Sequence, residues 1–267
     1  MKPIYGLVTG DLHVGSYYGL WPRKYKFHGG EYIPNVGQEY LGEIWQRILK
    51  ELRRDLSFII FNGDLIDGKQ RKEEGRGVVL PSPFYQREAC KKVTESIRKK
   101  ADRIYVVRGT RYHEDGDEME SLAQDIGAVA GTDGIRCRPV ARLKIGDIYI
   151  ECRHKISGAW VYTLSALERE HKADKEAAQF KGYSASLLIG GHRHQYRIGG
   201  GGGWLAINNP CMELQTAWAE EAQPNFWVPD LGVVLLELHP DYKDTHKQPI
   251  YVHPLLYPHP LPEVFEI

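Results

Sequence analysis

The stretch from Ser186 to His194 reads Ser-Leu-Leu-Ile-Gly-Gly-His-Arg-His, an apolar run that ends in two histidines one residue apart. Residues two apart in extended backbone project from the same face, so both the His192 and His194 imidazoles are expected to reach one metal centre. A histidine pair can also stand at an exposed strand end without binding anything. Further candidate metal ligands elsewhere in the sequence would favour the first interpretation.

Three further short apolar runs end in carboxylates or imidazoles. The runs are residues 4–9, 57–61 and 148–150, and the residues that follow them are Asp11, His13, Asp64 and His154. Apolar and β-branched runs of this length predict strands, and polar residues at strand ends lie in loops, where functional side chains concentrate. Together with His192 and His194, these residues are therefore candidates for one convergent site.

The residue types suit a pair of divalent cations. Two such ions repel each other, and a shared carboxylate and a bridging hydroxide offset this repulsion at a spacing of about 3.5–4 Å. We assign Asp64 as the shared carboxylate. Mixed imidazole and carboxylate ligands favour Mn, Fe or Zn over Ca or Mg. Two carboxylates against two divalent ions leave the site net positive, so it is predicted to attract an anion such as a phosphate ester.

The motifs occur in a characteristic order. They are Asp11-Leu12-His13, Gly63-Asp64-Leu65-Ile66-Asp67, the lone His154, and Gly191-His192-Arg193-His194. In this order the chain resembles the calcineurin-like metallophosphoesterases, whose pattern is Asp-x-His, Gly-Asp-x-x-Asp, Gly-Asn-His-Asp/Glu, a lone His, and Gly-His-x-His. The matching blocks span most of the chain. The resemblance implies an α/β fold, a four-layer α/β/β/α sandwich with two mixed β-sheets.

The resemblance also implies which residues hold each ion. Asp11, His13, Asp64 and His194 correspond to the ligands of one metal, and Asp64, His154 and His192 to those of the other. The implied reaction is hydrolysis of a phosphate ester, in which a metal-bridging hydroxide attacks phosphorus and a histidine protonates the leaving oxygen.

The third block departs from the family pattern. After residues 104–107 the chain reads Arg-Gly-Thr-Arg-Tyr-His-Glu, so Thr110 stands where the family has a metal-binding asparagine. A hydroxyl is a poorer ligand than an amide carbonyl, so the metal beside it is expected to bind more weakly. His113 is the best match to the catalytic histidine, but two extra residues precede it. No arginine follows Asp67, which weakens any likeness to the protein Ser/Thr phosphatases.

Helical patterns separate the apolar runs. Apolar residues recur at helical spacing in two segments, Leu41, Ile44, Trp45, Ile48 and Leu52 in the first and Ala89, Val93 and Ile97 in the second. Acidic residues from Asp117 suit the start of a third helix, and a fourth is predicted from Val161 to Phe180. A hairpin over residues 140–150 and late strands at 205–207 and 233–236 complete the pattern, which favours mixed sheets covered by helices.

Composition narrows the function further. The chain has 267 residues, with 35 Lys plus Arg against 35 Asp plus Glu. It lacks the global basic charge typical of a dedicated nucleic-acid-binding protein, so any attraction for anions has to be local. None of the four cysteines forms a Cys-x-x-Cys pair, and no apolar run is long enough to cross a bilayer. We therefore expect reduced thiols, no membrane partner and a cytoplasmic location.

The motifs extend from Asp11 to His194, which predicts a single metallophosphoesterase domain over residues 1–267. A Pro/His-rich C-terminal extension is expected from about residue 239, packed on the domain or on a neighbour; the spacing of its histidines fits no metal site. The glycines from Gly199 to Gly203 are interpreted as a flexible turn between strands. The sequence gives no oligomeric state.

Two segments beside the motifs combine basic and aromatic residues, which single-stranded nucleic acid can use for phosphate contacts and base stacking. They are the loop from Tyr17 to His28 and the run from Lys69 to Lys72. The alternative is that the aromatic rings pack the loop onto the domain and the charges are simply solvated. Nucleic acid is thus a candidate partner besides the phosphate-ester substrate.

Two classes of function remain open. The favoured one is a dinuclear metal-dependent phosphoesterase that cleaves a phosphodiester, with a nuclease as one form of it and a phosphomonoesterase as the alternative. The other is a non-catalytic scaffold that has kept the fold. Six of the seven ligand positions of the family are intact in this chain, which favours the enzyme.

Overall fold

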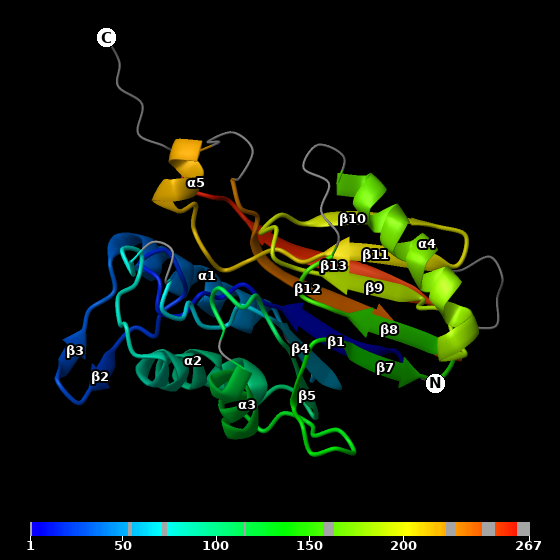
Figure 1. Ribbon diagram of the computed structural model, residues 1–267, viewed down its shortest axis with the longest axis horizontal. Helices are drawn as coiled ribbons and strands as arrows, with labels where there is room; N and C mark the ends of the chain where they lie inside the picture. Colours follow the sequence, from blue (N-terminus) through cyan, green and yellow to red (C-terminus); the bar gives the residue numbers. More distant parts are fainter. Residues whose placement is uncertain are drawn as a thin grey trace, which may run out of the picture.

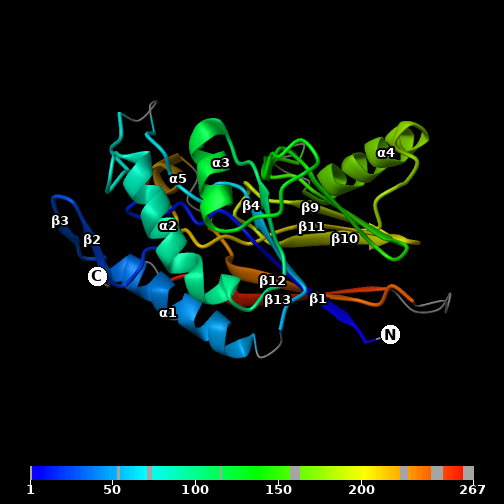
Figure 2. The same ribbon diagram turned by 90° about the horizontal axis from the view of Figure 1, so that it is seen from below.

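The computed structural model describes residues 2–52, 55–70, 74–114, 116–156, 163–222, 228–241 and 249–260. Two sheets pack face to face, and helices lie on their outer sides (Figures 1 and 2). The helices are α1 (Val36–Glu51), α2 (Pro83–Arg98), α3 (Gly116–Asp125), α4 (Thr163–Lys181) and α5 (Ala217–Ala222). The helices expected from the periodic patterns all form.

The larger sheet has six strands in the order β13-β12-β1-β4-β5-β6. Its strands are β1 (Ile4–Thr9), β4 (Phe58–Asn62), β5 (Ile104–Val107), β6 (Cys137–Arg138), β12 (Leu231–Leu238) and β13 (Ile250–Tyr257). β1, β4, β5 and β6 run parallel, whereas β12 is antiparallel to both of its neighbours.

The second sheet has five strands in the order β10-β11-β9-β8-β7, and β2 and β3 form a separate hairpin. The strands are β2 (Tyr25–Phe27), β3 (Gly30–Tyr32), β7 (Ala141–Ile145), β8 (Ile148–Cys152), β9 (Leu187–Gly190), β10 (Arg197–Gly201) and β11 (Trp204–Asn208). β8, β9 and β11 are parallel, and β7 and β10 are antiparallel edges. The prediction of an α/β fold with two mixed sheets is confirmed.

Buried apolar side chains form three clusters that hold the layers together. The first lies between the six-stranded sheet and helices α1, α2 and α3 and includes Trp45, Phe61 and Met119. The second lies between the two sheets, and the third between the five-stranded sheet and α4, where Leu167 meets Leu188. Alternation along each strand explains the division, since successive side chains point to opposite faces of the sheet.

Local signals set several element boundaries. Asn35 caps α1 because its side chain accepts a hydrogen bond from the Gln38 backbone N–H, and the Gln38 side-chain oxygen accepts one from the Asn35 backbone N–H, which forms a capping box. Pro83 occupies the first turn of α2, where its missing N–H costs nothing. Gly146, with φ of 59°, makes the tight turn between β7 and β8.

The glycine-rich segment and the C-terminal extension both contain strands. The interpretation of Gly199 to Gly203 as a turn is wrong for its first part. Arg197–Gly201 is strand β10, in which Gly200 pairs with Leu205, and only the last two glycines turn. Backbone pairing with β11 stabilises the three glycines in this strand, although they have no side chains to pack. The expected C-terminal extension contains β13, which pairs along its whole length with β12, while residues 242–248 and 261–267 lie outside the described residues.

All four cysteines are free and buried. Cys152 lies in the cluster between the two sheets, and burial raises its pKa well above the ordinary value. Its burial favours a structural role for this thiol. Among the described residues, no helix has the length and apolar character needed to cross a membrane.

His171 on α4 is buried against Trp204, with parallel rings whose centroids are 3.9 Å apart. Neither ring nitrogen of His171 has a hydrogen-bond partner in the part of the chain that the structure describes. Burial, and then the charge of Lys175, lower its pKa. The ring therefore packs as a neutral, nearly apolar group.

We expect His171→Phe to stabilise the protein by about 1–2 kcal/mol, because it keeps the ring stack and removes two buried polar atoms without partners. In the wild type the unfolded chain takes up a proton at His171 below pH of about 6.5, whereas the folded chain resists it. Wild-type stability should thus fall as the pH falls, and the advantage of the variant should grow. Denaturant unfolding at pH 7.5 and 5.5 checks this; an equal difference at both pH values would contradict it.

Candidate metal centre

The site residues predicted from the sequence lie in loops at the carboxyl ends of five strands. β1, β4 and β5 are parallel neighbours in one sheet, and β8 and β9 are parallel neighbours in the other. The carboxyl ends of parallel neighbours lie at the same edge of a sheet, where open α/β sheets bind ligands. The loops carry Asp11 and His13 after β1, Asp64 after β4, Thr110 and His113 after β5, His154 after β8, and His192 and His194 after β9.

Five of these residues have left-handed backbone conformations. The φ angles are 49° for Asp11, 45° for His13, 46° for Asp64, 69° for His192 and 56° for His194. Non-glycine residues rarely adopt this region, and each such position costs of order 1–3 kcal/mol that packing and hydrogen bonds must offset. Strain concentrated in this way is typical of a functional site.

The expected geometry of His192 and His194 is wrong. β9 ends at Gly190, and both histidines have positive φ, so the pair is not extended and the two rings do not share one face. His194 lies with Asp11 and His13, whereas His192 lies with Asp64 and His154. Each histidine therefore belongs to a different group of candidate ligands.

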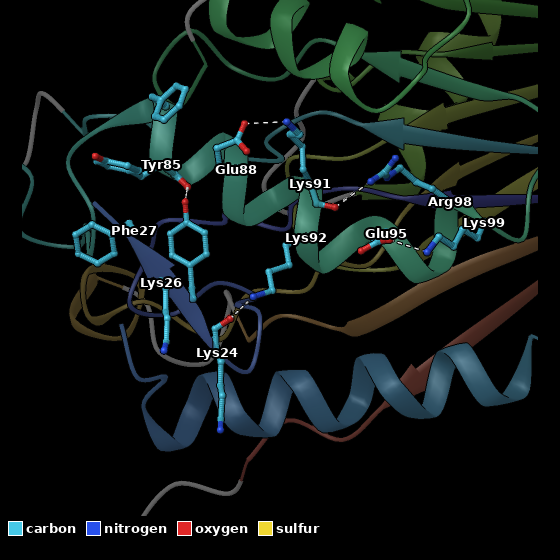
Figure 3. A pocket seen from close by; sticks show the side chains of 12 residues that line it. Lys24, Lys26, Phe27, Tyr85, Glu88, Lys91, Lys92, Glu95, Arg98 and Lys99 are labelled. Atoms are coloured by element: carbon cyan, nitrogen blue, oxygen red, sulfur yellow. Dashed lines mark hydrogen bonds and ion pairs between the residues drawn. The ribbon is translucent and has the colours of Figure 1, made fainter. Parts of the chain in front are cut away.

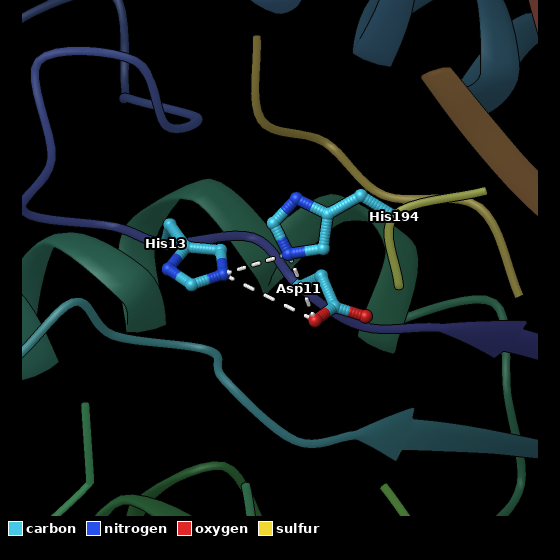
Figure 4. Close-up of side chains that lie close together, drawn as sticks. All are labelled: Asp11, His13 and His194. Carbon is cyan, nitrogen blue, oxygen red and sulfur yellow. Dashed lines mark hydrogen bonds and ion pairs between the residues drawn. The ribbon is translucent and has the colours of Figure 1, made fainter. Parts of the chain in front are cut away.

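The first group consists of Asp11, His13 and His194 (Figure 4), whose nearest ligand atoms all lie within 4.8 Å of one another. The Nε2 atoms of His13 and His194 are 3.3 Å apart. Asp11 Oδ1 lies 3.3 Å from His194 Nε2 and 4.0 Å from His13 Nε2. Two imidazole nitrogens and one carboxylate oxygen thus face a common point.

The second group consists of Asp64, His154 and His192. His154 Nε2 lies 2.9 Å from Asp64 Oδ2 and 3.7 Å from Asp11 Oδ1. The backbone N–H of His192 donates to both carboxylate oxygens of Asp11. Asp11 therefore lies between the two groups. The assignment of Asp64 as the shared carboxylate stays a prediction.

Three imidazoles of the site are oriented in the same way. The Nδ1 atom of His13 contacts Asp67 Oδ1 at 3.1 Å, that of His154 contacts the carbonyl oxygen of Asn62 at 2.7 Å, and that of His194 lies 3.5 Å from Glu213 Oε2. Each ring therefore presents Nε2 to the centre. A partner on the second nitrogen fixes the tautomer and orientation of a histidine ligand.

Glycine at position 63 is required by the close packing. A Cβ atom on Gly63 would lie 2.5 Å from His154 Nδ1, and the residue has φ of 71°. Any side chain would push His154 away from Asp64, which follows Gly63 directly.

Charges within the site keep the carboxylates ionised. Burial alone would raise the pKa values of Asp11 and Asp64, but the positive charge of His154 outweighs it and lowers both. Burial likewise favours neutral His154, yet the charges of Asp64 and Asp11 raise its pKa to about 10. Burial and the charge of His154 lower the pKa of His192 to about 4. The donor set is thus anionic carboxylates around imidazoles, which suits divalent transition metals.

Asp67 was not among the residues predicted for the site, although it is the second aspartate of Gly-Asp-x-x-Asp. Its Oδ1 lies 3.1 Å from His13 Nδ1 and 3.0 Å from His113 Nδ1, and its Oδ2 accepts from Gln70. The rings of His13 and His113 meet edge to face with centroids 4.5 Å apart. Asp67 therefore connects the predicted catalytic histidine to a candidate metal ligand.

Thr110 lies against Asp64. Its backbone N–H donates to Asp64 Oδ1 at 2.7 Å, and its hydroxyl lies 3.1 Å from both carboxylate oxygens. The buried carboxylate of Glu114 accepts from the backbone N–H groups of Leu65 and Gly109 and so holds the two loops together. Burial and the charge of Asp64 raise the pKa of Glu114 to about 8.

Glu213 and Asn209 also border the site, and sequence reasoning did not identify them. Asn209 donates to Asp11 Oδ2 and accepts from Asn62. Glu213 is held there by a backbone bridge with Gly19 and contacts the rings of His13 and His194. Neither residue belongs to a motif with ligand spacing, and only packing of distant segments brings them to the site.

Thr110→Asn is expected to raise the affinity for the ion beside Asp64, His154 and His192 by about ten-fold. The reason is that an amide oxygen is a better ligand than a hydroxyl. In the wild type this ion should be lost first when a chelator is titrated. Metal analysis along the titration measures both effects. Simultaneous loss of the two ions from the wild type would count against a role for Thr110.

No family model and no curated protein matches the chain. Solved structures similar to it include Vps29 from Entamoeba histolytica in complex with zinc, with 15% identity, a TM-score of 0.46, and coverage of 95% of this chain and 99% of that one. A novel archaeal phosphodiesterase has 12% identity and a TM-score of 0.44, covering 94% and 100%. A predicted phosphoesterase from Streptococcus pneumoniae has 12% identity and a TM-score of 0.38, and the match covers 89% of this chain and 84% of that one. All three TM-scores lie below 0.5, so the function proposed below rests on the geometry of the site.

Proposed function

We propose that this chain is a dinuclear metal-dependent phosphoesterase of the calcineurin-like metallophosphoesterase family and that it hydrolyses a phosphodiester. The observation that carries the proposal is the common orientation of His13, His154 and His194. Their Nε2 atoms lie 3.3–4.0 Å from Asp11 Oδ1, while Nδ1 of each is occupied elsewhere. Buried carboxylate oxygens and imidazole nitrogens that converge in this way are suited to binding divalent transition-metal ions.

The donor set divides between two ions. Asp11, His13 and His194 would hold one, with Asp64 shared, and Asp64, His154 and His192 would hold the other. Mixed imidazole and carboxylate donors fit manganese, with iron or zinc as alternatives. When bound, a pair of such ions supplies Lewis-acid polarisation of the phosphoryl group and a nucleophile active at neutral pH.

The residues around the ions have separate tasks. Asp67 fixes the His13 ring through Nδ1, and the same carboxylate oxygen lies 3.0 Å from His113 Nδ1. Burial disfavours charge on His113, but the hydrogen bond to Asp67 and the charge of Asp64 outweigh it and raise its pKa to about 9. His113 therefore carries a proton at neutral pH, and we assign its Nε2 as the donor to the leaving oxygen.

We take the substrate to be a phosphodiester, which carries a single negative charge and a poor alkoxide leaving group and so benefits from two ions together with a proton donor. The free, buried thiols suit the cytoplasm, which we propose as the compartment.

Metal analysis followed by hydrolysis assays tests the proposal. Purified protein loaded with manganese is expected to contain about two ions per chain and to cleave bis(p-nitrophenyl) phosphate faster than p-nitrophenyl phosphate. Faster cleavage of the monoester would reject the diesterase and keep the phosphoesterase. Two bound ions without hydrolysis of either compound would identify a scaffold.

A further inference from the structure

An open groove of about 830 Å³ lies between strand β2 of the β2–β3 hairpin and helix α2 (Figure 3). The hairpin follows the loop that begins at His13, and α2 follows the loop that carries Asp67. Cations from both walls line the groove, and they are Lys24, Lys26, Lys91, Lys92, Arg98 and Lys99. The chain as a whole is neutral, so this surface concentrates positive charge locally.

Only part of this charge is compensated. Lys91 pairs with Glu88 and Asp125, and Lys99 pairs with Glu95. The other cations form no ion pair with the described residues. They are Lys24, Lys26, Lys92 and Arg98.

Two of these unpaired cations are held in position. Lys92 Nζ donates to the backbone carbonyl oxygen of Lys24 at 2.7 Å, across the groove, and Arg98 donates to the carbonyl oxygen of Lys91 and the hydroxyl of Thr94. These contacts position the cations without neutralising them. The groove therefore has an excess of positive charge to offer an anion.

Aromatic rings lie among the cations. The ring centroids of Phe27 and Tyr85 are 5.3 Å apart, and those of Phe84 and Tyr85 are 5.4 Å apart. Phe84 is 49% exposed, and the Arg87 guanidinium lies over its ring with Cζ 5.2 Å from the centroid, so the ring and a cation stand together at the surface where a base could stack. Tyr25 is buried beneath them and anchors the hairpin to α2 by donating to the carbonyl oxygen of Tyr85.

The fold fixes the groove to the candidate metal centre. The Gln86 side chain, on α2, accepts from the backbone N–H of Gly68 at 2.7 Å and donates to the Gly68 carbonyl oxygen at 2.8 Å. Gly68 directly follows Asp67, which contacts His13 and His113. On the other wall, Trp21 is buried in the core, and its indole donates to the carbonyl oxygen of Ser16. Both walls are thus rigid continuations of loops that build the site.

We propose that this groove binds the strand of a single-stranded nucleic acid that flanks the bond to be cleaved. Unpaired cations along a groove with exposed rings suit a ligand that alternates phosphates with flat bases. Packing of Trp21 and Tyr25 into the protein confirms the alternative interpretation for those rings, while the lysines between and beside them remain exposed. The remainder of the second segment, residues 71–72, lies outside the described residues. The inference rests on the phosphodiesterase proposed above.

Binding and hydrolysis are measured separately in the test. Anisotropy of a fluorescein-labelled oligothymidylate, with the full chain in EDTA so that the strand stays intact, gives the affinity. The triple variant Lys24→Glu, Lys26→Glu, Lys92→Glu is expected to bind at least about ten-fold more weakly. The slope of log K against log salt concentration should become shallower by about two, as expected for three lost phosphate contacts. Phe84→Ala should weaken binding by about ten-fold without changing that slope.

The triple variant Lys50→Glu, Lys172→Glu, Lys175→Glu changes three exposed lysines on α1 and α4 and is the matched control for charge. All variants should cleave bis(p-nitrophenyl) phosphate at the wild-type rate. If the control variant binds the oligonucleotide as weakly as the groove variant, or if the wild type does not bind it, the proposed role of the groove is overturned. Retention on vesicles containing phosphatidylserine with no affinity for the oligonucleotide would also overturn it. Lack of diester cleavage by manganese-loaded wild type would instead reject the proposed function, and the two failures are therefore distinguishable.

Discussion

Asp64→Ala is expected to remove both metal ions and to lower phosphodiester hydrolysis by at least about 100-fold. Asp64 Oδ2 lies 2.9 Å from His154 Nε2, and its carboxylate accepts from the Thr110 backbone. Loss of the carboxylate leaves His154 without the nearest negative charge and removes the oxygens that we assign to both ions. Metal content by mass spectrometry and the rate with bis(p-nitrophenyl) phosphate measure the two effects.

Asp11→Ala is the informative comparison, since Asp11 Oδ1 lies within 4.0 Å of the Nε2 atoms of His13, His154 and His194. If Asp64 is the shared carboxylate, the Asp11 variant should keep the ion held by His154 and His192. Asp55→Ala, at an exposed position, serves as the control for folding and metal loading. Loss of both ions from the Asp11 variant and of one from the Asp64 variant would reverse the assignment.

His113→Ala is expected to keep both ions while losing about 10²–10⁴-fold in turnover on a diester with an alkoxide leaving group. The ring contacts Asp67 through Nδ1 and is 17% exposed, so Nε2 can reach a substrate in the opening. A leaving group such as p-nitrophenolate needs no proton, and the loss with that substrate should be much smaller.

Leaving groups of graded pKa give the decisive measurement for His113. The rates of the variant should depend more steeply on leaving-group pKa than those of the wild type. His113→Asn tests whether a side chain of similar size without a transferable proton restores activity; we expect no rescue. Loss of an ion from either variant would falsify the assignment and make His113 a metal ligand.

Much of the fold and most of the candidate ligands could be predicted from the sequence, because both depend on local patterns. The apolar runs that became β1, β4, β5, β8 and β9 have strand length and end at polar residues. Helical periodicity is likewise a local property, and α1 and α2 formed where it occurs. The glycine-rich strand β10 was missed because its three glycines interrupt any apolar pattern, and backbone pairing with β11 stabilises it instead.

Only one wall of the groove could be predicted from the sequence, again because sequence patterns are local. The basic and aromatic loop could be recognised in the stretch that contains Lys24 and Lys26. In the sequence, the lysines of α2 have the pattern of the solvent-exposed face of an ordinary helix. Lys92 and Lys24 are 68 residues apart, so no local pattern predicts their contact. The hairpin and helix come together because Tyr25 donates to the carbonyl oxygen of Tyr85 and the Phe27 ring packs against that of Tyr85.

By itself, the sequence determined which residues are available as ligands and that they stand at strand ends. The order of the motifs already implied that His192 and His194 belong to different groups of ligands, as the structure has them. The tertiary structure decided what surrounds the ligands: Asp67 joins His13 to His113, and Glu213 reaches two of the rings. The physical reason is distance along the chain. His13 and His194 are 181 residues apart, and their rings meet only because the carboxyl ends of strands from two sheets converge when the apolar faces of those sheets pack together.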